Sequence, residues 1–485
     1  MHRLRMISMT FLALVCLVAN TAFSQFIEPG VTILHTFTDT GTFGWAVADL
    51  NDIDSDGIKE VIIGAPLFGS AAPRRIGKVT VHSGRTGALL FAVTGVARDW
   101  QMGYSVADAG DVDGDTIPDI IAGGPIDGAG RARVYSGATG AILWTLNGEA
   151  AADSFGAAVA GAGDVDGDGR AEVAVGAPGN DGAGVLAGRV YVYSGMTGLV
   201  IRTIDGSTGS SFGSGLSSAG DVNHDGKSDL IVGAPGAGPS PIGRAFVYSG
   251  ADGSLLFPAL APDQPFSASF GTFFVAGIGD ATGDGTTDLY VGDFSDSTNG
   301  AGAGKAYVYS GSDGSLVRTF IGPPGAGLGP GRGAGDVNRD GREDLIIGSY
   351  TSGAGGSNAG RIEVFSGADG SVLRTLTHTI LGSQLGFDAV GVGDVNGDCA
   401  IDFLCSAALG NLVYVIAGTD VPILGDMNCD CTVSVADVDA FVLAMLDGAS
   451  YLIAHPGCDI QQADVNGDLA IDGVDVADFT ALLVP

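Results

Sequence analysis

The chain is poor in basic residues. Its 485 residues include 22 Lys and Arg against 55 Asp and Glu, and the formal net charge is −33. An acidic surface of this kind repels nucleic acids and anionic lipids, so neither is expected as a partner. Charged residues make up only 16% of the chain whereas 45% of the residues are hydrophobic, a balance that excludes a disordered protein.

Long apolar runs are absent beyond the N-terminus. One apolar stretch, at about 9–19, follows two arginines and precedes small residues at Ala22 and Ser24. It is shorter than the roughly 20 residues that a membrane-spanning helix needs. The pattern predicts a signal peptide over 1–24, cut before Gln25. We therefore expect a secreted, extracellular protein without a membrane span.

Cysteine is scarce and lies near the two ends of the chain. Cys16 belongs to the predicted signal peptide, and an exported location permits disulfides among the other cysteines. Those others are odd in number, so at least one thiol stays unpaired or pairs with another chain. They are Cys399, Cys405, Cys429, Cys431 and Cys458.

Histidine is also scarce, and no catalytic constellation is visible. After the signal peptide the histidines are His35, His82, His224, His378 and His455. The stretch "DFSDS" at 293–297 matches the DxSxS metal motif of adhesion domains, but that motif needs a strand-to-helix loop, and we interpret the match as a coincidence. The glycine run at 300–305 lacks the spacing of a nucleotide-binding loop and is interpreted as a turn. We expect a protein that is not an enzyme.

What the chain has in abundance is a repeat rich in glycine and aspartate. Glycine accounts for 82 residues, which suits a fold with many tight turns. One copy reads "AGDVDGDGRAEVAVGAP" from Ala162, and the copies follow one another at intervals of 53 to 59 residues. A near-constant period of this length indicates a repeat architecture. The first aspartates of the copies are Asp52, Asp111, Asp164, Asp221, Asp280, Asp336 and Asp394.

Each repeat predicts four short antiparallel strands. In the third copy they are "AAVAGAG", "EVAVGAP", "RVYVYSG" and "LVIRTI", and the fourth copy ends with "SLLFPAL" at 254–260. Because one such sheet cannot bury both faces, the repeats predict an all-β, seven-bladed β-propeller. A β-helix, the competing all-β fold, has a much shorter coil. The segment 31–37 resembles a fourth strand, and we expect it to complete the last blade, whose own strands end at 411–418.

The start of each repeat sets carboxylates at alternate positions of a loop. Ca²⁺ takes six to eight oxygens, and side chains at loop positions 1, 3, 5 and 9, with a carbonyl at position 7, can supply them. Position 12, acidic in a helix–loop–helix site, is an uncharged strand residue throughout, so we expect strand–loop–strand calcium sites. The weakest candidates have Thr282 at position 3 or Thr116 at position 6. The expected ligands are Asp52, Asp54, Asp56, Glu60, Asp111, Asp113, Asp115, Asp119, Asp164, Asp166, Asp168, Glu172, Asp221, Asn223, Asp225, Asp229, Asp280, Thr282, Asp284, Asp288, Asp336, Asn338, Asp340, Asp344, Asp394, Asn396, Asp398 and Asp402.

The pattern changes after Val421. The loops "DMNCDCTVSVAD" and "DVNGDLAIDGVD" carry an acid at position 12, and amphipathic stretches follow them. They predict two further sites, so that the chain would hold up to nine Ca²⁺ ions. Cys429 and Cys458 are candidates for a bridge between the first of these loops and the segment that links it to the second. The expected ligands are Asp426, Asn428, Asp430, Ser434 and Asp437 in one loop and Asp464, Asn466, Asp468, Asp472 and Asp475 in the other.

The repeats resemble a known family. "FG", "GDVDGDG" and "VGAP" are similar to the FG-GAP repeat of the integrin α-subunit head, over about 31–418, and the resemblance implies a seven-bladed propeller. Copy five departs with "VGDF" and copy six with "GLGPGRGAG". The tail looks like a type I dockerin module, which implies a small α-helical, EF-hand-like domain that folds around Ca²⁺ and docks onto a cohesin domain. We expect the propeller at 25–421 and the dockerin-like domain at 422–485.

The tail departs from the dockerin pattern at some positions. Position 6 of its loops is Cys431 and Leu469 in place of glycine. Positions 10 and 11, which in that family help to recognise the cohesin, are Val435–Ala436 and Gly473–Val474. The apolar character of these pairs leaves the partner open, and a structural role for the module by self-packing remains an alternative.

Two classes of function fit these features. The first is a secreted, calcium-binding adhesion protein whose propeller presents a surface to a protein or glycan ligand. The alternative is an accessory or catalytic component of extracellular polysaccharide degradation. A glycoside hydrolase should show paired carboxylates outside the metal loops. The chain offers no clear pair, so binding is favoured.

The ligand surface is expected on the side of the propeller opposite the calcium loops. There the connections vary in length and composition, and variable loops on a rigid frame are where recognition usually lies. Arg and Trp are enriched among residues that dominate binding energy. The alternative is that these side chains cover a seam between blades. The candidates are Phe68, Arg74, Arg75, Arg98 and Trp100.

Overall fold

The computed structural model describes residues 24–69, 75–95, 100–126, 128–238, 242–264, 269–419, 423–456 and 458–483. The predicted signal peptide lies outside these residues, except for Ser24. Within them, no helix is both long and apolar enough to cross a membrane.

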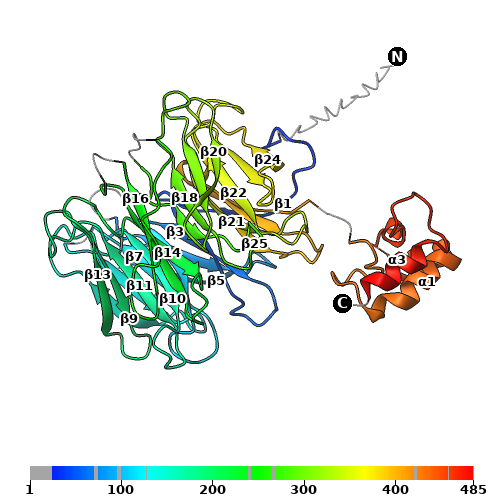
Figure 1. Cartoon of the computed structure of the whole chain (residues 1–485), viewed down its shortest axis with the longest axis horizontal. Coiled ribbons are helices and arrows are strands. Elements are labelled where there is room, and N and C mark those ends of the chain that lie inside the picture. Colours follow the sequence, from blue (N-terminus) through cyan, green and yellow to red (C-terminus); the bar gives the residue numbers. More distant parts are fainter. Residues whose placement is uncertain are drawn as a thin grey trace, which may run out of the picture.

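Seven antiparallel sheets form the body of the protein (Figure 1). The first three blades are β2 (Val47–Leu50), β3 (Glu60–Ala65), β4 (Lys78–His82) and β5 (Leu89–Thr94); β6 (Ser105–Gly110), β7 (Asp119–Gly124), β8 (Arg131–Tyr135) and β9 (Ile142–Asn147); and β10 (Ala158–Gly163), β11 (Glu172–Ala177), β12 (Arg189–Tyr193) and β13 (Val200–Asp205). The fourth and fifth are β14 (Gly215–Gly220), β15 (Asp229–Ala234) and β16 (Arg244–Tyr248); and β17 (Val275–Gly277), β18 (Leu289–Asp293), β19 (Lys305–Tyr309) and β20 (Leu316–Ile321). The last two are β21 (Leu328–Gly335), β22 (Asp344–Ser349), β23 (Arg361–Phe365) and β24 (Val372–Thr377); and β25 (Leu385–Gly393), β26 (Asp402–Ala407), β27 (Leu412–Ile416) and β1 (Ile33–Thr38).

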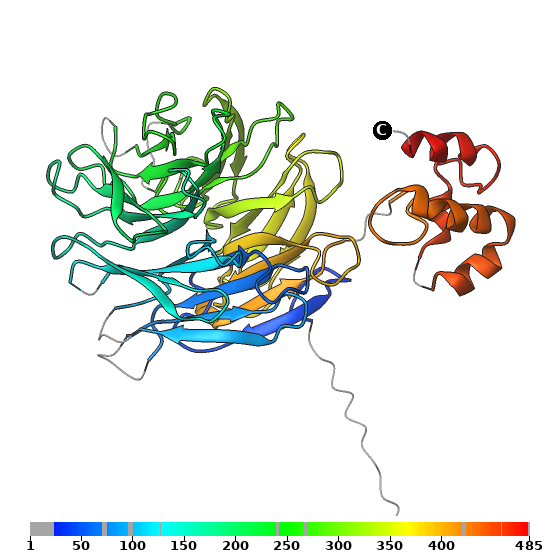
Figure 2. The ribbon, with the colours of Figure 1, turned by 90° about the horizontal axis from the view of Figure 1, so that it is seen from below.

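The sheets close into a ring, as the repeats predict. Each innermost strand contacts the innermost strands of the two neighbouring blades, and β25 of the last blade contacts β2 of the first (Figure 2). The strand β1 pairs antiparallel with β27, with Thr36 opposite Tyr414. The expectation that the N-terminal segment completes the last blade is therefore confirmed, and the ring has no free seam between its ends.

The glycines of the repeat let neighbouring blades approach closely. A Cβ placed on Gly176, in the "VGAP" stretch of the third blade, would lie 2.2 Å from the carbonyl oxygen of Gly213, the glycine of "FG" in the fourth. The same clash would arise between Gly64 and Gly103 in the first two blades. The phenylalanine of "FG", such as Phe212, is buried in the core between two blades. The motif therefore encodes the spacing of the blades as well as their strands.

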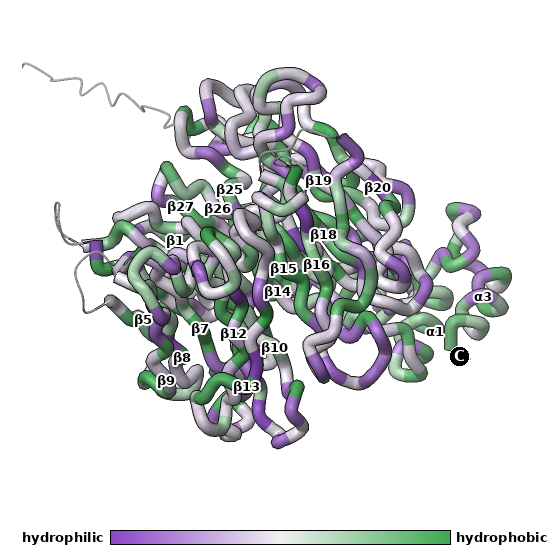
Figure 3. Tube along the Cα trace, turned by 60° about the vertical axis from the view of Figure 1, so that its left-hand side comes forward, coloured by the Kyte–Doolittle hydropathy of each residue, from purple (hydrophilic) through white to green (hydrophobic). Residues whose placement is uncertain are grey.

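The hydrophobic core follows the layers of the ring. The second strand of every blade is buried along its whole length, whereas the outermost strand β13 is largely exposed. Figure 3 shows hydrophobic segments inside the propeller around β15 and β18. Apolar clusters fill the space between successive sheets. A blade therefore depends on its neighbours for burial of both faces.

The fourth blade departs from the expectation of four strands. Its sheet has three, and the segment 254–260 meets β16 only through the isolated bridges of Leu255 with Tyr248 and Leu260 with Ala245. Pro258 lies between the two bridges and has no N–H to donate to a ladder. The proline explains why this segment follows the edge of the sheet without forming a strand.

The C-terminal part holds three short α-helices beside the propeller. They are α1 (Val438–Leu446), α2 (Gly448–Ala454) and α3 (Asp475–Leu482). The rings of Phe441 and Phe479, each four residues after the last acid of a loop, stack with their centroids 3.9 Å apart. This pair lies in a small core separate from those of the blades. The two loop–helix units therefore pack against each other through this pair.

Candidate functional site

The repeat loops share one backbone conformation, held by their own carboxylates. In the fourth loop, Asp221 at position 1 accepts the amides of Asp225 (3.0 Å) and Gly226 (2.8 Å). Asp225 at position 5 accepts the amide of Lys227 at 2.9 Å. The same bonds recur in the first loop, from Gly57 to Asp52 and from Ile58 to Asp56. The acidic side chains thus gather around the turn of the loop.

The acid at position 9 has a second, structural role. Asp344 is fully buried, and its Oδ2 accepts the amides of Val337 (2.8 Å) and Asn338 (3.3 Å) from its own loop. Its Oδ1 accepts the amide of Gly367 at 2.9 Å, after the third strand of the blade. Asp119, Glu172, Asp229, Asp288 and Asp402 make the matching bond to the glycine after their own third strands. This carboxylate ties the acidic loop to the turn between the third and fourth strands of the same blade.

Replacing Asp344 by alanine should lower the free energy of unfolding by about 3 kcal/mol, because three amides lose their acceptor and two of the bonds are buried. The loss should persist in chelator, since it comes from backbone hydrogen bonds. Asp369→Ala is the matched control, because Asp369 lies fully exposed in a turn of the same blade. Denaturant unfolding of both variants measures the difference, and equal stability would contradict this role for position 9.

Carboxylates converge in several loops. In each of the following groups the nearest oxygen atoms lie within 4.8 Å of one another. The groups are Asp52, Asp54, Asp56 and Glu60; Asp111, Asp113 and Asp115; Asp164, Asp166 and Glu172; and Asp426, Asp430 and Asp437. Burial, together with the nearby charges of Asp54 and Asp52, raises the pKa of Glu60 to about 8. A cation beside this carboxyl would favour its charged form.

The fourth to seventh loops have an uncharged residue at position 3, where the first three have aspartate. Asn223 in the fourth loop donates its side-chain amide to Asp225 at 2.9 Å, and Asn338 and Asn396 do the same in the sixth and seventh. In the fifth loop, Thr282 occupies this position, yet its amide still bonds the buried Asp288 at 2.8 Å. The loop conformation is therefore kept where the charge at position 3 is lost.

The tail loops repeat this arrangement with a different closing residue. Asp437 at position 12 is buried and accepts the amides of Met427 (2.8 Å) and Ser434 (2.8 Å). Asp475 closes the second loop with bonds from Asn466 (3.2 Å) and Asp472 (2.9 Å). Both acids reach back from the start of a helix, so the predicted ligand sets of the two loops lie around their turns.

Two disulfides involve the tail, and one of them joins it to the propeller. Cys429 pairs with Cys458, the bridge suggested by the sequence, and Cys405 is free and buried. Cys399 of the seventh propeller loop pairs with Cys431 of the first tail loop, with Cα atoms 5.3 Å apart. The sequence reading missed this bridge. The sequence marks both cysteines only as departures from glycine, because each stands at loop position 6, where most of the loops have glycine.

The Cys399–Cys431 bridge should hold the tail to the propeller after the connecting chain is cut. With a protease site inserted between residues 419 and 423, the cleaved protein should run as one species on a non-reducing gel and as two after reduction. Cys431→Ser should release the tail without reductant, whereas Cys405→Ser, which changes the buried free thiol, should not. Release of the tail from the unmutated protein under oxidising conditions would contradict the bridge.

The residues predicted to bind ligand do not form one exposed patch. Trp100 is completely buried, and the Arg133 guanidinium lies 4.5 Å above its ring. The expectation that Trp100 meets a ligand is therefore wrong for its side chain, which fills the seam between the first two blades. Phe68 is half-buried with Lys78 5.0 Å from its ring, and Arg75 is exposed. Arg74 and Arg98 lie outside the described residues.

The "DFSDS" stretch begins in a strand. Asp293 ends β18 and is buried, accepting a bond from the hydroxyl of Ser269 at 2.8 Å. Asp296 is also buried and accepts the hydroxyl of Thr298 at 2.6 Å. No helix follows within the described part of this blade, in line with the interpretation that the match to the DxSxS motif is a coincidence.

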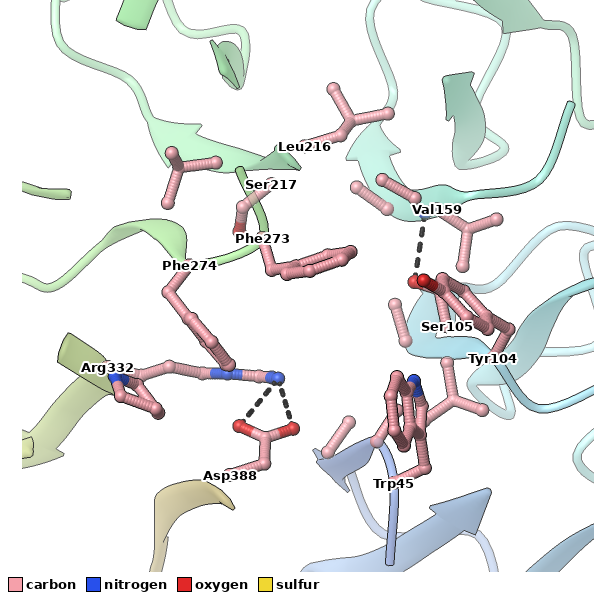
Figure 4. A pocket seen from close by; sticks show the side chains of 18 of the residues that line it. Trp45, Tyr104, Ser105, Val159, Leu216, Ser217, Phe273, Phe274, Arg332 and Asp388 are labelled. Carbon is pink, nitrogen blue, oxygen red and sulfur yellow. Dashed lines mark hydrogen bonds and ion pairs between the residues drawn. The ribbon is translucent and has the colours of Figure 1, made fainter. Parts of the chain in front are cut away.

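The centre of the ring contains a cavity of about 490 Å³, lined by the innermost strands (Figure 4). Six aromatic rings follow one another around it, with centroid distances of 4.7 to 6.4 Å between neighbours. We call this set the aromatic collar. It consists of Trp45, Tyr104, Phe273, Phe294, Tyr350 and Phe387.

The aromatic collar lies on the side of the variable connections. Trp45, Tyr104 and Phe387 directly follow the "FG" position of their blades. Trp45 and Tyr104 precede the innermost strands β2 and β6, and Phe387 lies near the start of the innermost strand β25. Phe294 and Tyr350 follow the second strands of their blades. The acidic loops follow the opposite ends of the innermost strands. The collar therefore lies on the face that the sequence indicated for recognition. Its members differ from the residues that the sequence analysis proposed for that face.

Comparison with known proteins matches this architecture. A family model described as the FG-GAP repeat matches residues 155–193, 212–251 and 333–365. Integrin alpha-8 of Gallus gallus is 33% identical over 237 residues, and integrin alpha-V of the same organism is 34% identical over 230. The chain contains an FG-GAP β-propeller.

The alignments with the two integrins cover only part of each protein. The aligned region is 44% and 43% of this chain, and 22% and 21% of the two integrin chains, so the chain spans about a fifth of the length of these relatives. A solved structure of BBS1N in complex with ARL6DN is similar over 80% of this chain and 97% of that chain, with a TM-score of 0.50 and 8% identity. That likeness shows the propeller fold alone.

Proposed function

We propose that the protein is an exported, calcium-binding and non-catalytic protein that binds or adheres to an extracellular protein or glycan through its propeller. The observation that carries the proposal is the convergence of carboxylates in the loops of an FG-GAP propeller. The similarity to integrin α chains supports a binding or adhesion role.

The donor set of the loops suits calcium. The converging groups offer only oxygen ligands, which hard cations prefer. In the first loop, three of the four carboxylates have no basic partner at ion-pair distance within the described residues, while Arg85 contacts Asp56 at 3.0 Å. A divalent ion would offset the remaining repulsion and cross-link the loop. The residues at positions 1, 3 and 5 would hold it, and the buried acid at position 9 would fix the loop to its blade.

The tail supports a docking role. It combines two acidic loops with helices, as a dockerin-like module would, and positions 10 and 11 are exposed in both loops, with 78% of Val435 and 61% of Val474 accessible. We propose that Val435 and Val474 contact a cohesin-like partner. The two disulfides fit an oxidising, extracellular location.

An array of glycans and matrix proteins tests the binding role. The calcium-loaded protein should be captured by at least one class of ligand, and chelator should reduce the capture. The isolated C-terminal module is the control, since capture by that module alone would place recognition outside the propeller. Absence of capture with and without calcium would overturn the proposal.

Docking can be tested separately with purified cohesin domains. The double variant Val435→Asp/Val474→Asp should lose binding, because two desolvated carboxylates would face the partner. Leu446→Asp is a matched control, since Leu446 is 81% exposed but lies at the far end of α1. Equal loss in both variants, or no binding by the unmutated protein, would favour the self-packing alternative.

A further inference from the structure

The central cavity has the aromatic surface of a ligand site. Phe273 of the collar lines the cavity and is 42% exposed, so its aromatic ring is open to a ligand. At the positions equivalent to Trp45 and Tyr104, the third and fourth blades carry Ala157 and Ser214. Small residues on that side leave room beside the aromatic rings. The volume of about 490 Å³ lies in the range of small-molecule sites.

The charged groups around the cavity are compensated within the protein. Arg332 Nη2 donates to both carboxylate oxygens of Asp388, at 2.9 and 3.1 Å. Asp49 pairs with Lys59 at 2.7 Å. Asp108 accepts bonds from the amide and side chain of Asn51. An anionic ligand would therefore find no unpaired basic group in the described wall. A cationic ligand would find only Asp108 without a basic partner, and its carboxylate is already hydrogen-bonded to Asn51.

The cavity still offers hydrogen-bonding groups. Figure 4 shows Arg332 extending across the cavity with Asp388 below it. The Nε and Nη1 of Arg332 make no hydrogen bond to any described residue, and 30% of its side chain is exposed. Ser217 and Ser105 also line the wall. Planar Arg–Asp pairs and hydroxyls can both donate to and accept from a polyhydroxylated molecule.

We propose that the central cavity binds a neutral oligosaccharide, with sugar rings packed on the aromatic collar and hydroxyls bonded to Arg332 and the nearby serines. The C–H face of a pyranose packs on aromatic rings, and its hydroxyls need the mixed donors and acceptors of the cavity wall. This inference rests on the proposed binding function and names the ligand class and the residues that take it.

Charge distinguishes this ligand from the alternatives. A polyanion would be repelled by a chain of net charge −33. A cationic side chain of a protein partner would be drawn to the acidic surface, but Asp388 and Asp49, two of the three acids in the wall, are already paired with basic side chains. A neutral molecule with one apolar face and many hydroxyls meets neither obstacle.

Isothermal titration of the calcium-loaded full chain tests the inference. The probes are the tetrasaccharides of β-1,4-glucose, β-1,4-xylose, β-1,4-mannose and α-1,4-glucose, with tetragalacturonate and an arginine-rich peptide as charged comparators. At least one neutral probe should bind with one-to-one stoichiometry. Phe273→Ala and Trp45→Ala should each weaken it roughly tenfold, because each removes one aromatic wall.

Two further variants separate binding from folding. Leu199→Ala removes an apolar side chain that is 67% exposed on the outer side of the third blade, and it should leave the affinity unchanged. Arg332→Lys keeps the positive charge beside Asp388 but removes the planar N–H groups, and it should weaken binding with little change in melting temperature. If Trp45→Ala fails to fold, Phe273→Ala still provides the test, since its side chain is partly exposed.

The inference is overturned if no neutral probe binds at millimolar concentration, if the collar variants bind as well as the unmutated chain, or if only a charged comparator enters the cavity. Binding of a protein or glycan on the array that the collar variants leave intact would overturn the inference alone. Absence of any array ligand would overturn the proposed function with it.

Discussion

Removal of calcium should lower the melting temperature of the propeller by about 10 °C. An ion that binds only the folded loops stabilises them by about 2.7 kcal/mol at a hundredfold excess over its dissociation constant, so three filled loops contribute roughly 8 kcal/mol. A domain of this size shifts by roughly 1–2 °C per kcal/mol. Thermal unfolding followed by circular dichroism, before and after exhaustive chelation, measures the difference.

A loop variant shows whether the effect comes from the acidic loops. Asp164→Asn/Asp166→Asn removes two converging carboxylates of the third loop and should reduce the calcium-dependent shift by about a third, if that loop is one of three filled sites. Asp313→Asn/Asp369→Asn alters two fully exposed aspartates in turns between outer strands and should leave the shift intact. An unchanged melting curve after chelation would mean that the loops are held by their hydrogen bonds alone.

Deletion of residues 25–38 should prevent the propeller from folding. The deletion removes β1, whose pairing with β27 closes the ring, together with Phe26, which is buried against His378 and Tyr414. The outer edge of the last blade would then be open, and its core would lose two phenylalanines. We expect loss of the cooperative thermal transition and aggregation of the purified chain.

The control removes a larger piece from the other end. A chain that ends at residue 419, with Cys399→Ser to avoid a free thiol on the loop, should keep a cooperative transition because the tail has its own core. The two truncated chains therefore test opposite ends of the protein, and only the N-terminal deletion removes a strand of the ring. If the C-terminal truncation unfolds the β domain and the N-terminal one does not, closure through β1 is not what holds the ring.

Much of the fold was predictable because its determinants are local and repeated. The alternation of polar and apolar residues marks each strand, and the constant period reveals the number of blades. The "FG" and "VGAP" glycines already carry the inter-blade contact, as Gly176 against Gly213 shows. Loop positions 1, 3, 5 and 9 were identifiable for the same reason, since nine residues contain all the acids that gather around one turn.

Other features depended on residues that are distant in the chain. Trp100 is buried partly because the guanidinium of Arg133, from β8, covers its ring. The residues around Trp100 in the sequence do not predict this contact. The missing strand of the fourth blade required Pro258 to be weighed against an otherwise strand-like segment. The bridge between Cys399 and Cys431 joins two modules whose relative placement the sequence does not express.

The sequence by itself determined the repeat, the all-β architecture and the acidic loops, because each depends on contacts within one repeat or between adjacent ones. The closing strand was also evident from the sequence, although it pairs with the other end of the chain, because the N-terminal segment has the pattern of a fourth strand and the last repeat lacks one. Only the tertiary structure decided where the central cavity, the proposed ligand site, lies. Trp45, Phe273 and Phe387 belong to three different blades, and they come within reach of Arg332 and Asp388 only when the ring closes. A cavity at the axis of a ring is a property of all its blades together, so its aromatic collar cannot be read from any one of them.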